Sequence, residues 1–208
     1  MQLADAIRGF YAVLDRDDPQ LARALLTAGA RVLQLRIKGD QRIGGGELAR
    51  IGRWARTMCD EVGAALVIND RLDVALTVGA DGVHLGQTDM PLASAREVAG
   101  DRLWIGISTH DVDQVRAAVA GGADYLGFGP VFATRTKKNP DPVQGLAGLR
   151  AAVIAAGTVP VVAIGGIPVD QASAIYATGA AAICAISAVN DAPDVGLAAR
   201  AFAKDSKL

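Results

Sequence analysis

The sequence has little cysteine, almost no net charge and no long apolar run. Two cysteines cannot form a disulfide framework, and the apolar surroundings of Cys59 and Cys184 predict reduced, buried thiols. A formal net charge of −1 gives the protein no overall positive potential that would attract nucleic acid. No run of about 18 uncharged apolar residues is present, and the N-terminal segment lacks a basic-then-apolar signal pattern. We therefore expect a cytoplasmic protein with no nucleic-acid or membrane partner.

The remaining composition is that of a globular protein rich in turns. Apolar residues make up 51% of the chain and charged residues 21%, so hydrophobicity is too high and net charge too low for disorder. Glycine accounts for 24 of 208 residues, which predicts many tight turns. No linker or low-complexity tract interrupts the chain, and its length suits one domain over residues 1–208.

Short runs rich in valine, isoleucine and leucine alternate with longer amphipathic stretches. Because each run is almost continuously apolar, it is typical of a parallel strand covered on both faces. Eight such strands, each followed by a helix, predict a closed (β/α)8 barrel with few insertions. The runs are Tyr11–Leu14, Val32–Ile37, Ala65–Ile68, Gly82–Leu85, Trp104–Ile107, Tyr125–Phe128, Val159–Ile164 and Ala181–Ile186.

Helix boundaries are marked by local signals. Apolar residues between Leu48 and Val62 recur at spacings of three and four, which predicts an amphipathic helix. Asp18 followed by Pro19 is typical of a helix N-terminus. The triple glycine at 44–46 follows no strand directly and lacks the lysine of a phosphate loop, so we interpret it as a flexible loop opening a helix.

Chemistry in this fold lies at the carboxyl ends of the strands, so the residues that end each run are the candidates. Strand alternation places Gln34, Arg36 and Lys38 on one side of the second strand. Two inward-facing cations are costly unless an anion meets them. With Lys137 after the sixth strand, they predict an anion site. The alternative is a solvated strand end and an ordinary polar loop.

Two carboxylates, Asp70 and Asp89, follow neighbouring strands. One or two carboxylates together with substrate phosphates commonly hold Mg²⁺, so we expect a metal-bound pyrophosphate here. The alternative is that each aspartate caps the helix that follows it.

Gly165 and Gly166 end the seventh strand, where a close backbone approach and a following helix start favour a phosphate. His84 and His110 are the only histidines, and we interpret both as structural or supporting residues rather than general bases. The residues alone therefore indicate an enzyme that binds two phosphate-bearing ligands.

Several segments in order along the chain resemble the thiamine phosphate synthase (thiamine-phosphate pyrophosphorylase) family, from about Tyr11 to Ala188. The H-L-G-Q-x-D and T-x-T-K-K segments are specific together. The segments that carry the resemblance are Gln34–Lys38, Ile68–Arg71, Ala80–Asp89, Gly106–His110, Thr134–Lys138 and Val162–Ile167.

The resemblance implies a transferase that joins hydroxymethylpyrimidine pyrophosphate to hydroxyethylthiazole phosphate through a pyrimidine-stabilised cation. It implies that Asp70 and Asp89 hold Mg²⁺, and that Gln34 orients the pyrimidine. The pyrophosphate would be bound by Arg36, Lys38, Asn69 and Lys137, with Ser108 near the leaving group. The thiazole phosphate would be bound by Thr134, Thr136, Gly166, Ile186 and Ser187. Arg36, Lys137 and Ser108 would be the catalytic residues.

Two positions depart from the family pattern. Ile37 stands where glutamate is usual, and Ala133 where proline is common. Because Ile37 alternates away from the site, we expect little effect on the chemistry, whereas Ala133 bears on how firmly the following loop is held.

Two other functions remain open at this point. A thiazole tautomerase would need a proton-transfer residue, for which His110 is the candidate. A non-catalytic thiamine phosphate binder would be free to lose the two carboxylates, and this sequence keeps both. A homodimer is expected only because dimers are the commonest closed assembly.

Overall fold

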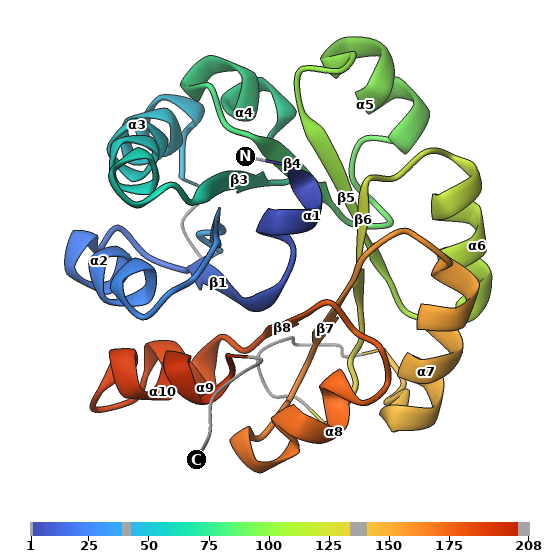
Figure 1. Ribbon diagram of the computed structural model, residues 1–208. Helices are drawn as coiled ribbons and strands as arrows, with labels where there is room; N and C mark the ends of the chain where they lie inside the picture. Colours follow the sequence, from blue (N-terminus) through green and yellow to red (C-terminus); the bar gives the residue numbers. More distant parts are fainter. Residues whose placement is uncertain (1, 39–42, 134–140, 204–208) are drawn as a thin grey trace.

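The eight predicted strands form one closed parallel barrel in the computed structural model, which describes residues 2–38, 43–133 and 141–203. Helices surround the barrel as an outer ring (Figure 1). The strands are β1 (Gly9–Leu14), β2 (Val32–Leu35), β3 (Ala65–Asn69), β4 (Gly82–Leu85), β5 (Trp104–Thr109), β6 (Tyr125–Phe128), β7 (Val161–Ile164) and β8 (Ala182–Cys184). The expected (β/α)8 fold is confirmed.

Each strand is followed by at least one helix, as predicted. The helices after the strands are α2 (Pro19–Thr27), α3 (Gly45–Val62), α4 (Leu72–Val78), α5 (Leu92–Ala99), α6 (Val112–Ala120), α7 (Gly145–Ala156), η1 (Val169–Gln171) with α8 (Ala172–Tyr176), and α9 (Ser187–Asn190) with α10 (Val195–Ala201). The sequence did not predict the short helix α1 (Leu3–Ala6), which lies across one end of the barrel (Figure 1).

The alternation of side chains along each strand divides the apolar residues into two cores. Phe10, Ala12 and Leu14 of β1 pack outward against the helices, whereas Tyr11 and Val13 point into the barrel. Residues from α1 join the interior core and close that end of the barrel. The amino end of the barrel interior is therefore covered, whereas the strands terminate at the opposite end.

The local signals for helices hold in the structure. The Asp18 side chain accepts hydrogen bonds from the backbone of Gln20 (2.9 Å) and Leu21 (3.0 Å) at the start of α2. Helix α3 ends at Gly63, whose φ of 66° favours glycine. Gly44 is the N-cap of α3 and the helix begins at Gly45, so the triple glycine does open this helix but lies mostly within it.

Strand boundaries differ from prediction by at most two residues, with one consequence for the site. β2 ends at Leu35 rather than Ile37, so Arg36 and Lys38 lie just beyond the ladder. The Arg36 backbone N–H still bonds the Leu14 carbonyl at 2.9 Å, which continues the strand direction. Ile37 packs against the outer core, away from the barrel interior, as its alternation predicts.

Two aspartates fasten the amino ends of neighbouring strands to the helix layer. Asp81 accepts from the Leu66 N–H (2.8 Å) and pairs with Arg56 of α3. Asp124 accepts from the Ile105 N–H (2.6 Å) and pairs with Arg96 of α5. These partly buried pairs stabilise the amino end of the barrel.

Candidate active site at the carboxyl ends of the strands

The predicted site residues that the structure describes gather at one end of the barrel, because all eight strands run parallel. They come from the ends of β2, β3, β5, β7 and β8 and from the turn after β4. Thr134, Thr136 and Lys137 lie outside the described residues, so the structure does not bear on them. The described members are Gln34, Arg36, Lys38, Asn69, Asp70, Asp89, Ser108, Gly166, Ile186 and Ser187.

Asp70 and Asp89 form a carboxylate pair beside a cation. Lys38 Nζ lies 3.1 Å from Asp70 Oδ2, and Asp89 Oδ2 accepts from the Gly86 N–H at 2.7 Å. Burial and then the facing Asp89 carboxyl raise the pKa of Asp70, while Lys38 opposes the shift. Two facing carboxylates in a partly buried position favour a cation between them.

The carboxylate pair does not serve as helix caps. Helix α4 has Arg71 as its N-cap and α5 has Pro91, and neither N-terminus receives a side-chain cap. Asp70 also adopts a φ of 62°, a conformation that residues other than glycine seldom adopt. The capping alternative is therefore wrong for both residues, and their placement needs another reason.

The donor set fits Mg²⁺ held jointly with a ligand better than a metal held by protein alone. Within the described ranges, no group of three or more histidine, cysteine, aspartate or glutamate side chains could hold a metal ion. Mg²⁺ is commonly bound by one or two carboxylates together with substrate phosphates and water. The carboxylate pair supplies that number of protein ligands.

Arg36 provides a second positive charge directed at the barrel mouth. Burial lowers the pKa of His84 and the Arg36 charge lowers it further, while at Cys184 burial raises the pKa and the Arg36 charge opposes that rise, so the guanidinium lies close to both. Among the residues that the structure describes, no acidic side chain pairs with Arg36. An anionic ligand would supply the missing partner.

A continuous chain of hydrogen bonds crosses the barrel interior below these charges. The distances are 2.9 Å from Gln34 Nε2 to the Tyr11 hydroxyl, 2.9 Å from there to the Tyr125 hydroxyl, 3.1 Å to His84 Nδ1, and 2.9 Å from His84 Nε2 to Ser108 Oγ. We call these five residues the interior chain. It links the residue expected to orient the pyrimidine with the residue expected near the leaving group.

Burial fixes the protonation states in the interior chain. Burial raises the pKa of Tyr11 and of Tyr125 far above the ordinary value, so both phenols keep their protons. Burial, and then the charges of Arg36 and Lys38, lower the pKa of His84 to about 4. At neutral pH the imidazole is therefore uncharged, and it acts as a hydrogen-bond partner of Ser108.

Sequence reasoning missed Tyr11 and Tyr125. A tyrosine in an otherwise apolar strand needs a partner for its hydroxyl, and two such tyrosines in one barrel could have signalled the pair. Gly106 makes room for the ring, because a Cβ there would lie 2.1 Å from Tyr125 Cζ. The structure also places His84 against Ser108, in the supporting position that the sequence suggested.

His110 lies at the edge of the barrel mouth. Its Nδ1 is 2.6 Å from the Gly129 carbonyl oxygen, and its Nε2 is 3.5 Å from Asp141. These contacts hold the ring against the loop that follows β6, which agrees with a structural role.

The loop after β6 is bonded to the end of β7. The N–H groups of Val131 and Phe132 donate to the carbonyls of Ile164 and Gly165, both at 2.9 Å. A Cβ on Gly166 would lie 2.1 Å from the Ala133 oxygen, so only glycine allows this approach. The two glycines therefore seat the loop that leads to residues 134–137.

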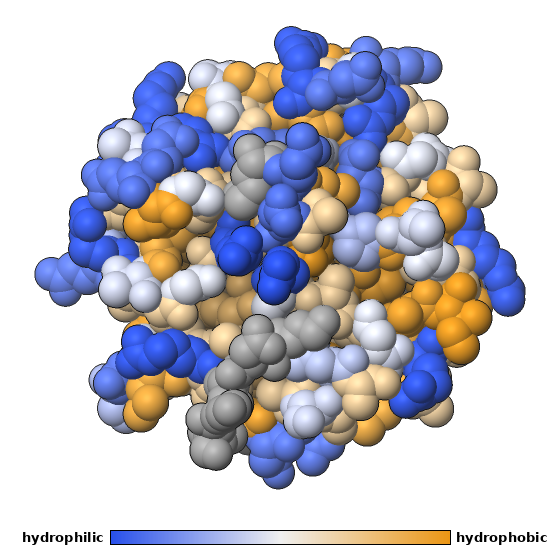
Figure 2. Space-filling view, in the orientation of Figure 1, coloured by the Kyte–Doolittle hydropathy of each residue, from blue (hydrophilic) through white to orange (hydrophobic). Residues whose placement is uncertain are grey.

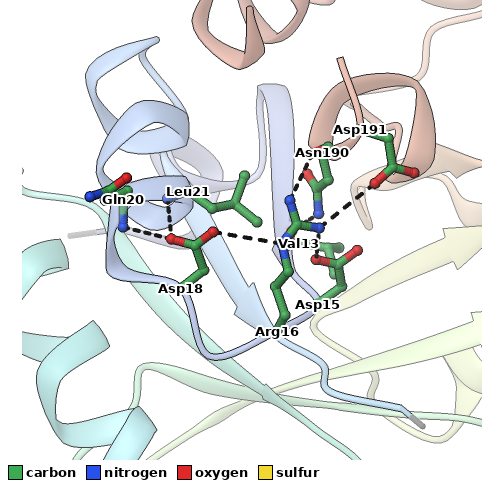
Figure 3. Close-up of polar contacts among 8 residues, drawn as sticks. All are labelled: Val13, Asp15, Arg16, Asp18, Gln20, Leu21, Asn190 and Asp191. Carbon is green, nitrogen blue, oxygen red and sulfur yellow. Dashed lines mark hydrogen bonds and ion pairs between the residues drawn. The ribbon is translucent and has the colours of Figure 1, made fainter. Parts of the chain in front are cut away.

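Ile186 and Ser187 begin α9, and the closing seam of the barrel positions them. Ser187 is the first residue inside the helix, Ile186 is its N-cap, and no side chain caps it. β1 pairs with β8 through only two residue pairs. Asn190 compensates by donating to the Val13 carbonyl at 2.9 Å (Figure 3).

Arg16 fastens the same seam from the loop after β1. Its guanidinium donates to the Asn190 carbonyl at 2.8 Å and lies 3.7 Å from Asp191 and from Asp18 (Figure 3). The contacts join the first and last βα units, and thereby hold the helix that carries Ser187.

With this geometry in place, comparisons with known proteins decide the family. The model of the family described as thiamine monophosphate synthase matches residues 10–189. The chain belongs to this family. Thiamine-phosphate synthases from Methanospirillum hungatei (44% identical, 88% of this chain and 87% of the relative) and Moorella thermoacetica (44%, 87% and 84%) are similar to it.

A solved structure extends the likeness to the fold. The thiamine phosphate pyrophosphorylase from Pyrococcus furiosus superposes with a TM-score of 0.86 at 38% identity, covering 97% of this chain and 96% of the other. The prediction of a thiamine phosphate synthase, a transferase, is confirmed. The buried free thiols Cys59 and Cys184 also agree with expectation.

Proposed function

We propose that this chain condenses hydroxymethylpyrimidine pyrophosphate with hydroxyethylthiazole phosphate, and releases thiamine phosphate and pyrophosphate. The observation that carries the proposal is the carboxylate pair beside Lys38 at the mouth of the barrel. Asp70 and Asp89 would hold Mg²⁺, and the metal together with Lys38 would supply positive charge for a pyrophosphate. Family membership supports the same reaction.

The proposed reaction is dissociative. The bond between the pyrimidine methylene carbon and the pyrophosphate oxygen breaks, and the pyrophosphate leaves with the bonding pair. The exocyclic amine of the pyrimidine donates electron density to the resulting cation. The thiazole nitrogen then forms the new C–N bond with its lone pair, so no protein nucleophile is required.

The protein's part is to stabilise the departing anion, since charge develops there in the transition state. Arg36, Lys38, Asn69 and Lys137 would bind the pyrophosphate, and Ser108 would donate to it. Mg²⁺ held by the carboxylate pair would neutralise part of the leaving group's charge.

Substrate positions follow from the same arrangement. Gln34, 5% exposed, would orient the pyrimidine from inside the barrel. The thiazole phosphate would meet Gly166, Ile186 and Ser187, with Thr134 and Thr136 from the loop after β6. Ala133 is exposed in the same loop, and its carbonyl oxygen approaches the Gly166 backbone closely.

The tautomerase and the non-catalytic binder receive less support. A tautomerase would need a proton-transfer residue rather than a metal-bound pyrophosphate site, and Asp70, Asp89 and Lys38 lie together at the barrel mouth. A binder needs no carboxylate pair, yet Asp70 holds a costly backbone conformation. The relatives with which the chain aligns are named as synthases.

The assembly and cellular location stay predictions. In the described ranges, no helix is long and apolar enough to cross a membrane. Figure 2 shows apolar residues over the region of α6 and α7, and Ile154 on α7 is 75% exposed. A homodimer and a cytoplasmic location remain expectations from the sequence.

The test of the metal role is Asp70→Asn, with Asp73→Asn as the matched control. Asp73 lies three residues away on α4, where it pairs with exposed Arg71. We expect Asp70→Asn to raise the Mg²⁺ concentration for half-maximal activity at least about tenfold, since one of two carboxylate ligands is lost. Asp73→Asn should behave as the unaltered protein. An identical Mg²⁺ dependence in both variants would contradict the assignment.

A further inference from the structure

The direction of each hydrogen bond in the interior chain can be assigned by counting the hydrogen atoms that its members can donate. Each tyrosine hydroxyl has one proton to donate, and a neutral imidazole has one N–H. The Gln34 amide Nε2 donates to the Tyr11 oxygen. Within the described residues, the other hydrogen-bond partner of the Tyr11 hydroxyl is the Tyr125 hydroxyl.

This count assigns a single donor-to-acceptor direction along the interior chain, from Gln34 to Ser108. The Tyr11 oxygen accepts from Gln34. Within the described residues the Tyr125 oxygen is the one remaining partner that can accept the Tyr11 proton, so the proton goes there. The Tyr125 proton then goes to His84 Nδ1, 3.1 Å away. An imidazole that accepts at Nδ1 carries its hydrogen on Nε2, and this hydrogen points at Ser108 Oγ.

The opposite direction leaves a buried group unpaired. If His84 carried its hydrogen on Nδ1, it would donate to Tyr125, and Tyr125 would donate to Tyr11. The Tyr11 oxygen would then accept from both neighbours, and its proton would find no acceptor among the described residues around it. Tyr11 is 3% exposed, and a buried hydroxyl proton without a partner is unfavourable.

We propose that Tyr11, Tyr125 and His84 are positioning residues that set the direction of the Ser108 hydroxyl. Because Ser108 Oγ accepts from His84, its own proton cannot point back to the ring and is presented to an anion in the barrel mouth. The inference rests on the proposed function, in which that anion is the leaving pyrophosphate. The Gln87 amide holds the Ser108 backbone carbonyl at 2.6 Å and keeps the residue in place.

The first test reads the tautomer directly, in protein labelled with ¹⁵N at histidine. His110 is the internal reference, because a carbonyl oxygen lies 2.6 Å from its Nδ1 and requires a hydrogen there. The two histidines of this chain should therefore show opposite patterns, with His84 protonated on Nε2. A His84 spectrum protonated on Nδ1 would overturn the proposal.

Tyr125→Phe removes the donor to His84 Nδ1, and Tyr176→Phe is the matched control. Tyr176 is the third tyrosine of the chain, and its hydroxyl donates to the Phe202 carbonyl at 2.7 Å outside the barrel. The His84 pattern should change in Tyr125→Phe and remain in Tyr176→Phe. An unchanged His84 pattern in Tyr125→Phe would overturn the proposal, and Tyr11→Phe gives a second reading if Tyr125→Phe does not fold.

The second test is kinetic and separates positioning from packing. Tyr125→Phe should lower kcat about tenfold, the scale for losing an orienting partner, with the KM for thiazole phosphate unchanged. In a Ser108→Ala background the same change should have no further effect on kcat, because no hydroxyl is left to orient. An equal loss in both backgrounds would mean that the tyrosine acts through packing.

The positioning role and the proposed function can each be refuted without the other. The tautomer is measured without substrate, so a chain that forms no thiamine phosphate could still show the predicted pattern. Conversely, an active synthase with His84 protonated on Nδ1 would refute only the positioning role.

Discussion

Gly166→Ala tests how the end of β7 seats the loop that follows β6. Gly166 has a φ of 60°, and a Cβ there would lie 2.1 Å from the Ala133 oxygen and 2.9 Å from the Phe132 oxygen. Both atoms belong to the backbone, so no side-chain rotation relieves the contact. The loop must move, and it leads directly to the segment expected to carry Thr134 and Lys137.

The losses of stability and of activity expected for Gly166→Ala come from two separate contributions. Alanine in a left-handed conformation costs about 1–2 kcal/mol of folding stability. Moving the Ala133 oxygen from 2.1 Å to at least 3.0 Å displaces the loop by about 1 Å. A displacement of that size at an active site can lower activity by about 10²-fold.

Gly79→Ala separates the two contributions. Gly79 ends α4 with a φ of 65°, and a Cβ there would meet nothing within 4 Å. We expect both variants to lose similar stability from the backbone conformation in urea unfolding. Only Gly166→Ala should lose about 10²-fold in kcat/KM for the thiazole phosphate. If Gly166→Ala keeps a kcat/KM within about twofold of Gly79→Ala, the loop is not seated in the way described.

Three further predictions concern the charge of the site, the barrel frame and the thiols. Lys137→Ala should lower kcat at least about 10²-fold, the scale for one charge-stabilising donor, and a near-normal rate would exclude that role. Arg56→Ala should lower the free energy of unfolding by about 2 kcal/mol, below the range for a fully buried pair, because it leaves the partly buried Asp81 carboxylate without its cation; urea titration measures the loss. Burial raises the pKa of the Cys59 and Cys184 thiols to about 12, so the thiolate is scarce at pH 8. A thiol reagent should label both only on unfolding, and rapid labelling of the folded protein would contradict their burial.

Much of the fold could be predicted because it depends on local patterns. Short apolar runs such as Tyr125–Phe128 match their strands residue for residue. The parallel barrel then brings strand-end residues together whatever the details of packing, which is why Lys38 and Asp70 were expected at one mouth and lie 3.1 Å apart. Boundaries such as the end of β2 at Leu35 depend on neighbouring strands and were less accurate.

The features that were missed depend on contacts across the barrel. Tyr11 and Tyr125 are 114 positions apart, and their hydroxyl contact requires the registers of every intervening strand. The left-handed backbone of Asp70 could not be predicted, because aspartate adopts that conformation only occasionally and nothing in the local sequence requires it there. Helix α1 is only four residues long, and its function of closing the barrel appears only once the barrel exists.

The most direct test of the central claim is to supply the purified protein with hydroxymethylpyrimidine pyrophosphate, hydroxyethylthiazole phosphate and Mg²⁺, and to quantify both products over time. The account predicts catalytic formation of thiamine phosphate and pyrophosphate in equal amounts, abolished by a chelator and restored by added Mg²⁺. Binding of the thiazole phosphate with no turnover would contradict the synthase, and full activity after thorough chelation would contradict the metal role of Asp70 and Asp89.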